Sequence, residues 1–265
     1  MLFADDSALV AHSAADMQVL VDHFAKAAAQ FSLKINIKKT ECMYQPIKLI
    51  TPLPEPEVIT IDHKPLVFAS DFTYLGSTVS NTAKIDKELR NRLGKASAAF
   101  GKLQQRLWNN RHVSIRVKCK VYRAVVLSCL LYGAEAWTIY RTQVKKLSAF
   151  MMRQLRDIMS VKWFDKITNE EILRRANLPC MADILIERNL RWVGHVHRME
   201  NDRLPRQLLY SQLKEGKRNQ GRPRLRFKDV AKRNMKWREI NLNSWQTTAK
   251  NRVAWRTATK SKPKP

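Results

Sequence analysis

The spacing of the apolar residues changes near position 80 and divides this chain into two kinds of structure. In residues 1–80 the apolar runs are short and lie between turn-forming residues, a pattern typical of β-strands. From Lys84 onward the apolar residues recur every three or four positions, which is typical of helices that pack one face on a core. We therefore predict an α+β fold, with antiparallel β hairpins and a helix first and mainly α-helices afterwards.

Residues 2–11 indicate two short apolar strands around an acidic turn that holds Asp5 and Asp6. Ser13 and Asp16 have capping-box spacing, so we expect a helix to start there and to pack its apolar face on this hairpin. Further short strands of a small antiparallel sheet are expected at 58–61, 66–68 and 72–80, the last with a turn at Gly76.

The helical part begins with one long apolar repeat and continues through shorter ones. Helices are expected at 84–107, 114–132, 143–160, 169–177, 181–199, 204–215 and 226–239. The turn-rich segment 216–225 is predicted to be a basic loop, and the final SKPKP a disordered tail.

The net charge of +26 is unevenly placed along the chain. Residues 1–80 hold 6 Lys and Arg against 9 Asp and Glu, residues 81–200 hold 24 against 10, and residues 201–265 hold 19 against 4. Because Lys and Arg neutralise phosphates and release counterions, the basic part is expected to bind RNA and DNA with little sequence preference. A surface that only increases solubility is the alternative.

Compartment signals favour a soluble intracellular protein of the nucleus or cytoplasm, with no membrane partner. The 4 cysteines form no CxxC pair, which is typical of a reducing compartment. No apolar run reaches the ~18 residues of a membrane span. The start, MLFADDSALV, lacks the basic region of a signal peptide.

Asp5 and Asp6 are the strongest chemical feature of the sequence. Adjacent carboxylates on a tight turn concentrate negative charge, which a divalent cation and phosphate oxygens can neutralise. In nucleotidyl transfer, two metal ions activate a hydroxyl and stabilise the leaving pyrophosphate. Asp-Asp pairs are also common in ordinary surface turns, so the pair alone does not identify a metal site.

The sequence around this pair resembles a known family. FADD with a trailing apolar strand, an amphipathic helix, SLKINIKKTE and FTYLGSTVS occur here in the order of consecutive motifs in the reverse transcriptases of non-LTR retrotransposons, the long-interspersed-element class. The resemblance implies that Phe3 to Asp6 form the metal-binding hairpin of a polymerase palm. Asp5 then matches the direct Mg²⁺ ligand and Asp6 its acidic neighbour.

Two further motifs of the same family match this chain. Asn36, Lys39 and Thr40 match an Asn-x-x-Lys-Thr motif whose lysine lies near the incoming triphosphate. The catalytic set implied by the resemblance is thus Asp5, Asp6 and Lys39. Tyr74, Leu75 and Gly76 match a turn in the hairpin that holds the primer end.

The resemblance extends over nearly the whole chain and implies three domains. Residues 1–80 correspond to the carboxy-terminal part of the palm, residues 81–200 to a helical thumb or connection, and residues 201–265 to a basic nucleic-acid-binding region. RWVGHVHRM and GRPRLRFKDV resemble the carboxy-terminal region of the same polyproteins, where we assign them no chemical role.

In the family, another essential metal-ligand Asp lies on a strand upstream of the acidic hairpin, which here begins at Phe3. We therefore expect a fragment of an RNA-directed DNA polymerase that is inactive alone and holds Mg²⁺ weakly or not at all. The alternative is a nonspecific RNA- or DNA-binding protein derived from the element.

Cationic side chains on the basic loop and the helix after it are the predicted nucleic-acid contacts. They are Lys217, Arg218, Arg222, Arg224, Arg226, Lys228, Lys232 and Arg233. Most tryptophans fall on apolar helix faces, but Trp237 and Trp255 stand beside cations and are candidates for stacking on bases.

His195 and His197, with Cys180 upstream, are an alternative zinc set. Structural zinc needs four ligands in paired short spacings, whereas residues two apart on a helix point to nearly opposite sides. We therefore favour exposed or phosphate-contacting histidines.

Overall fold

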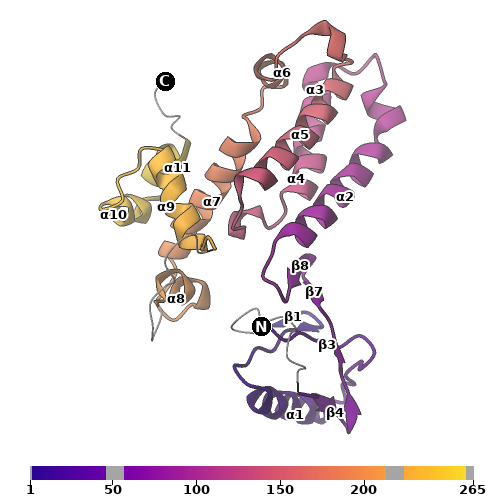
Figure 1. Ribbon diagram of the computed structural model, residues 1–265, viewed down its shortest axis with the longest axis vertical. Helices are drawn as coiled ribbons and strands as arrows, with labels where there is room; N and C mark the ends of the chain where they lie inside the picture. Colours follow the sequence, from indigo (N-terminus) through magenta and orange to yellow (C-terminus); the bar gives the residue numbers. More distant parts are fainter. Residues whose placement is uncertain (1, 46–56, 213–223, 261–265) are drawn as a thin grey trace. The chain divides into compact units, whose positions relative to one another are not determined.

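A computed structural model describes residues 2–45, 57–212 and 224–260 (Figure 1). The chain divides into two compact units, Met1–Asn91 (unit 1) and Arg92–Pro265 (unit 2). Helix α2 (Asp86–Lys102) begins in unit 1 and ends in unit 2.

Unit 1 begins with the predicted hairpin. β1 (Leu2–Phe3) pairs antiparallel with β2 (Asp6–Ser7), and Phe3 lies opposite Asp6. The turn between them passes through Ala4, whose φ of 52° is uncommon for a residue with a Cβ. The acidic hairpin expected from the sequence is therefore confirmed.

Helix α1 (Ala14–Gln30) starts where the capping pattern predicts. The Ser13 hydroxyl accepts a hydrogen bond of 3.1 Å from a backbone amide of the first turn, which satisfies one of the free N–H groups there. The helix packs mainly on β4 (Thr60–Ile61), whereas we expected it to cover the acidic hairpin. Its Gln18 side chain makes two hydrogen bonds of 2.9 Å to the backbone of Thr60, as a neighbouring strand would.

The strands described in unit 1 form four two-stranded sheets, which departs from the single antiparallel sheet expected. β3 (Glu41–Cys42) and β6 (Val67–Phe68) pair in parallel. The other antiparallel pairs are β4 with β5 (Lys64–Pro65) and β7 (Asp71–Tyr74) with β8 (Ser77–Ser80). A small core joins α1 to these strands; its buried residues are Val21, Ile59, Ile61 and Leu66.

The helices of unit 2 follow the predicted segments closely up to α7. They are α2, the π-helix η1 (Gln104–Trp108), α3 (Ile115–Val121), the π-helix η2 (Tyr122–Val126), α4 (Leu127–Leu130), α5 (Arg141–Ile158), α6 (Asn169–Ala176) and α7 (Met181–His197). Two 3-10 turns, η3 (Ala134–Ala136) and η4 (Trp163–Asp165), lie between them. Large side chains are fully buried in this core, among them Tyr122, Leu130, Leu147, Met151, Leu155 and Ile172.

The last helices are α8 (Leu204–Tyr210), α9 (Phe227–Trp237), α10 (Trp245–Lys250) and α11 (Arg252–Lys260). The sequence predicted α8 and α9 but neither α10 nor α11. Helices α9, α10 and α11 all pack on α7, as Figure 1 shows. Their shared core consists of Leu190, Val193, Ala231, Met235, Ala249 and Trp255.

None of the helices in the described ranges is both long enough and apolar enough to cross a membrane.

Candidate functional site

The acidic hairpin presents its two carboxylates to solvent. Asp5 lies in the turn and Asp6 begins β2, and both side chains are exposed. Neither carboxylate has a hydrogen-bond or ion-pair partner among the described residues. The pair is therefore open to an external cation, and no neighbouring Lys or Arg of the described chain neutralises it.

Mg²⁺ prefers six oxygen ligands and is commonly held by one or two carboxylates with waters and substrate phosphates. The hairpin offers two such carboxylates. Within residues 2–45, 57–212 and 224–260, no group of three or more His, Cys, Asp and Glu side chains could hold a metal ion. Asp5 and Asp6 thus fit a Mg²⁺ ion only as a partial ligand set.

Lys39 lies in a tight turn that Asn36 and Thr40, the other residues of its motif, stabilise by hydrogen bonds. The Asn36 carbonyl accepts hydrogen bonds from the Lys39 amide at 3.0 Å and from the Thr40 hydroxyl at 2.9 Å. The Asn36 side chain adds a bond of 3.3 Å to the same Lys39 amide. Asn36 and Thr40 therefore shape the backbone, and the Lys39 side chain is exposed to solvent.

Tyr74 ends β7, and Leu75 and Gly76 form the turn of the β7–β8 hairpin, where the turn was predicted. Leu75 and Gly76 have φ values of 48° and 78°, which suits a two-residue hairpin turn. The Glu88 carboxylate holds this hairpin to the start of α2 by accepting the Thr78 amide at 2.7 Å. The role of the turn at a primer end stays a prediction.

The cationic side chains predicted to contact nucleic acid, on α9 and just before it, differ in their interactions. The Arg226 guanidinium pairs with the Asp229 carboxylate at 3.3 Å, and Lys228 donates to the carbonyl of Ser211. Partial burial, with Arg226 and Lys232 nearby, lowers the pKa of Lys228. The remaining described members, Arg224, Lys232 and Arg233, are exposed. Lys217, Arg218 and Arg222 lie outside the described residues.

The RWVGHVHRM string forms the carboxy-terminal half of α7, and its glycine has a packing role. A Cβ on Gly194 would lie 2.1 Å from Trp255 Nε1, so only glycine lets the Trp255 ring approach α7 this closely. The indole donates a 2.8 Å hydrogen bond to the carbonyl of Leu190. Trp255 is 2% exposed, so its predicted stacking on bases is wrong, whereas Trp237 is 57% exposed and its stacking stays a prediction.

The two histidines of this string face different surroundings, as the helical spacing predicts, but the expectation that both are exposed or contact phosphate is wrong for His197. His197 is buried, and its Nδ1 lies 2.6 Å from the Tyr210 hydroxyl. His195 is exposed beside the Trp192 ring, with ring centroids 5.4 Å apart. Burial lowers the pKa of His197, and the positive charge of Arg206 lowers it further.

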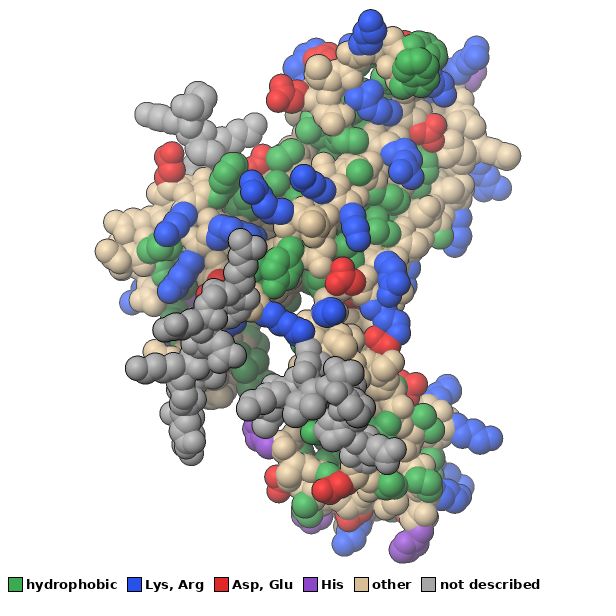
Figure 2. Space-filling view, in the orientation of Figure 1, with side chains coloured by type: hydrophobic (Ala, Val, Ile, Leu, Met, Phe, Trp, Pro, Cys, Tyr) green, Lys and Arg blue, Asp and Glu red, His purple; other side chains and the backbone are tan. Residues whose placement is uncertain are grey.

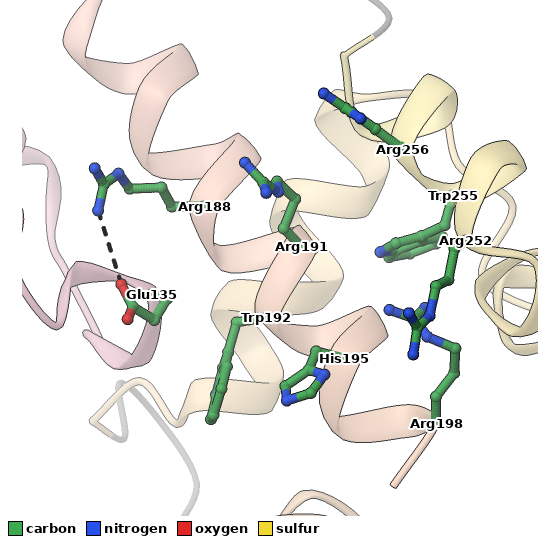
Figure 3. Close-up of a pocket in the computed structure, with 9 residues that line it drawn as sticks. All are labelled: Glu135, Arg188, Arg191, Trp192, His195, Arg198, Arg252, Trp255 and Arg256. Carbon is green, nitrogen blue, oxygen red and sulfur yellow. Dashed lines mark ion pairs between the residues drawn. The ribbon is translucent and has the colours of Figure 1, made fainter. Parts of the chain in front are cut away.

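A cationic pocket of about 570 Å³ lies between η3, α7 and α11 (Figure 3). Its lining residues are Glu135, Arg188, Arg191, Trp192, His195, Arg198, Arg252, Trp255 and Arg256. The sequence did not reveal this pocket, because the pattern of residues 252–260 predicted no helix at α11. A signal was present on α7, where Arg188, Arg191, His195 and Arg198 recur at helical spacing and so share one face.

Over nearly its whole length, the chain is similar to an uncharacterized transposon-derived protein of Caenorhabditis elegans. The two sequences are 24% identical over 264 residues, which cover 96% of this chain and 92% of the relative. No protein-family model matches the chain, and no solved structure matches it.

Proposed function

We propose that this chain derives from the reverse transcriptase of a non-LTR retrotransposon and binds RNA and DNA through the cationic surface of unit 2. The similarity to a transposon-derived protein carries the first part, because it covers 96% of the chain. It supports an origin in a transposable element. The assignment to a reverse transcriptase rests on the order of the motifs in unit 1.

The placement of those motifs supports this assignment. FADD forms a hairpin with exposed carboxylates, NIKKT forms a turn that displays Lys39, and YLG forms a second hairpin turn. In an intact polymerase, Asp5 and Asp6 would hold Mg²⁺, which would stabilise charge on the transferring phosphate. Lys39 would bind the triphosphate.

Nucleic-acid binding rests on the charge of unit 2. Residues 92–265 hold 40 Lys and Arg against 12 Asp and Glu. On the face shown in Figure 2, Lys and Arg side chains are spread over the helices of unit 2 with few acidic side chains between them. Such a surface binds the phosphate backbone and distinguishes poorly between sequences.

The test is fluorescence anisotropy with labelled RNA and DNA of unrelated sequences and equal length at low salt. We expect binding to all of them, with similar affinities for different sequences. Absence of binding at low salt would contradict the proposed function, and a strong preference for one sequence would contradict its nonspecific form.

A second activity to test is RNA-directed DNA polymerisation, because the exposed carboxylates of the hairpin match the metal-binding motif of that family. Nucleotidyl transfer uses two metal ions, and two carboxylates from one hairpin are too few to position both. We therefore expect no primer extension by the 265-residue polypeptide in Mg²⁺. Extension that is lost in Asp5→Asn would show instead that the hairpin is catalytic in this chain.

A further inference from the structure

We propose that the pocket between α7 and α11 binds an unpaired nucleotide of RNA or DNA, with its arginines on the phosphates and Trp192 against the base. This inference rests on the proposed function and adds a defined site to it. It also gives the RWVGHVHRM string a binding role, since Arg191, Trp192, His195 and Arg198 all line the pocket.

The pocket holds more positive charge than its own acidic group can balance. Its single carboxylate, Glu135, lies 3.9 Å from the Arg188 guanidinium, which also donates to a backbone carbonyl at 2.9 Å. The guanidinium groups of Arg191, Arg252 and Arg256 are exposed and have no hydrogen-bond or ion-pair partner in the described part of the chain. Like charges gathered in a concave site attract an anion from solution.

Two of the guanidiniums point toward each other. Figure 3 shows the Arg198 and Arg252 side chains converging from α7 and α11. Arg198 is anchored by a 2.5 Å hydrogen bond to the Ala249 carbonyl, while its buried Nε has no partner in the described chain. Burial lowers the pKa of Arg198, and the positive charge of Arg252 lowers it further. A phosphate between the two would relieve this repulsion and accept bonds from both planar groups.

Trp192 supplies a surface for a base. Its side chain is half-buried and lines the same pocket, and its ring contacts the exposed His195 ring. Bases of single strands stack on such aromatic side chains beside cations, with little dependence on sequence. The buried Trp255, which also lines the pocket, packs its ring closely against Gly194 of α7 and so holds α11 against α7.

An unpaired nucleotide fits these groups better than a duplex or an acidic peptide does. The bases of a duplex are stacked on one another inside the helix, so their faces cannot reach Trp192. An acidic peptide offers carboxylates for the arginines but no ring for the tryptophan. The volume of about 570 Å³ lies within the range of ~300–1,000 Å³ typical of small-ligand pockets.

The test compares a single strand that forms no secondary structure with a duplex of the same length, by fluorescence anisotropy on the full chain. Trp192→Leu should weaken single-strand binding about 5- to 150-fold, the usual cost of losing one base stack, and leave duplex binding nearly unchanged. Trp192→Phe keeps an aromatic face and should restore most of the affinity. Trp163→Leu is the matched control, because Trp163 is 88% exposed and does not line the pocket.

The phosphate contacts are tested by Arg191→Gln with Arg252→Gln. The matched control is Lys145→Gln with Lys146→Gln, which removes the same charge from exposed positions on α5. We expect the arginine pair to cost more single-strand affinity than the lysine pair. Circular dichroism checks that each variant is folded. If Trp192→Leu does not fold, Trp192→Phe still tests the stacking.

The outcomes separate the two proposals. If the unchanged protein binds no nucleic acid, both the proposed function and this site are wrong. If it binds but the pocket variants behave like their controls, only the pocket assignment is wrong. Equal losses of single-strand and duplex binding in Trp192→Leu, or competition by polyglutamate as strong as by a single strand of equal charge, would also overturn the nucleotide site.

Discussion

The two units differ in where they place charge and in how much apolar surface they bury. Unit 1 holds 9 Lys and Arg against 11 Asp and Glu, whereas unit 2 holds 40 against 12. The core of unit 1 around α1 has four buried residues, while unit 2 buries large side chains from most of its helices. The motifs that resemble those of reverse transcriptases therefore lie in unit 1, which has the smaller core. The surface expected to bind nucleic acid lies in unit 2, which has the larger core.

The largest expected effect is that of salt on binding. If unit 2 contacts about six phosphates, affinity should fall roughly a thousandfold between ~50 and ~200 mM salt. Lys232→Gln with Lys236→Gln, both exposed on α9, should lower the affinity and reduce the slope of log affinity against log salt by up to about two.

Lys26→Gln with Lys34→Gln removes the same charge from exposed positions of unit 1 and serves as the control. It should change affinity and slope much less. A loss as large as that of the α9 variant would show that both units bind the phosphate backbone and that the difference between them is not functional.

The next effect concerns glycines, which the two units need for different reasons. Gly194→Ala should destabilise unit 2 by about 3 kcal/mol, because the Cβ would displace the Trp255 ring and break its hydrogen bond to Leu190. Gly76→Ala should cost only about 1 kcal/mol, since nothing lies within 4 Å of its Cβ and only its φ of 78° is unfavourable.

Denaturant unfolding measures both changes. Gly101→Ala is the control, because this glycine lies in α2 with open space around it and alanine favours helices. It should stabilise by up to about 1 kcal/mol. Equal costs for Gly194→Ala and Gly76→Ala would mean that Trp255 does not approach α7 as closely as described.

A third prediction compares the local stability of the units. Because unit 1 has the smaller core and its described strands pair only in twos, its amides should exchange at least about tenfold faster than those of α5 and α7. Hydrogen exchange followed by mass spectrometry measures this directly. Slower exchange in β4 and α1 than in α5 would contradict the link between core size and stability.

Local signals made much of the fold predictable. The start of α1 follows from the spacing of Ser13 and Asp16, and the β7–β8 turn follows from Gly76. The helices from α2 to α7 follow from apolar repeats within single segments. Each of these features depends on residues that are close in the sequence.

Long-range contacts account for what the sequence did not reveal. The parallel pairing of β3 with β6 and the packing of α1 on β4 join distant segments. Trp255 stands among cations in the sequence, yet it is buried by a contact with a helix 65 residues away. The arginine pocket depends on that same contact, so only the stripe of cations on α7 could have been found in advance.

The smallest expected effect is a pH dependence that belongs to unit 2. Burial and the neighbouring Arg206 lower the pKa of His197, whose imidazole bonds to Tyr210. The unfolded chain therefore takes up a proton near the ordinary imidazole pKa of about 6.5, and the folded chain does so only at lower pH. Stability should be fully present above about pH 6.5 and decline as pH falls through the folded pKa, by at most about 1.4 kcal/mol per pH unit from this group.

Urea unfolding of unit 2 from neutral to mildly acidic pH measures the slope. His197→Gln should flatten it, while His195→Gln changes an exposed imidazole of the same helix and should leave it in place. A slope that survives in His197→Gln would assign the pH dependence to other groups.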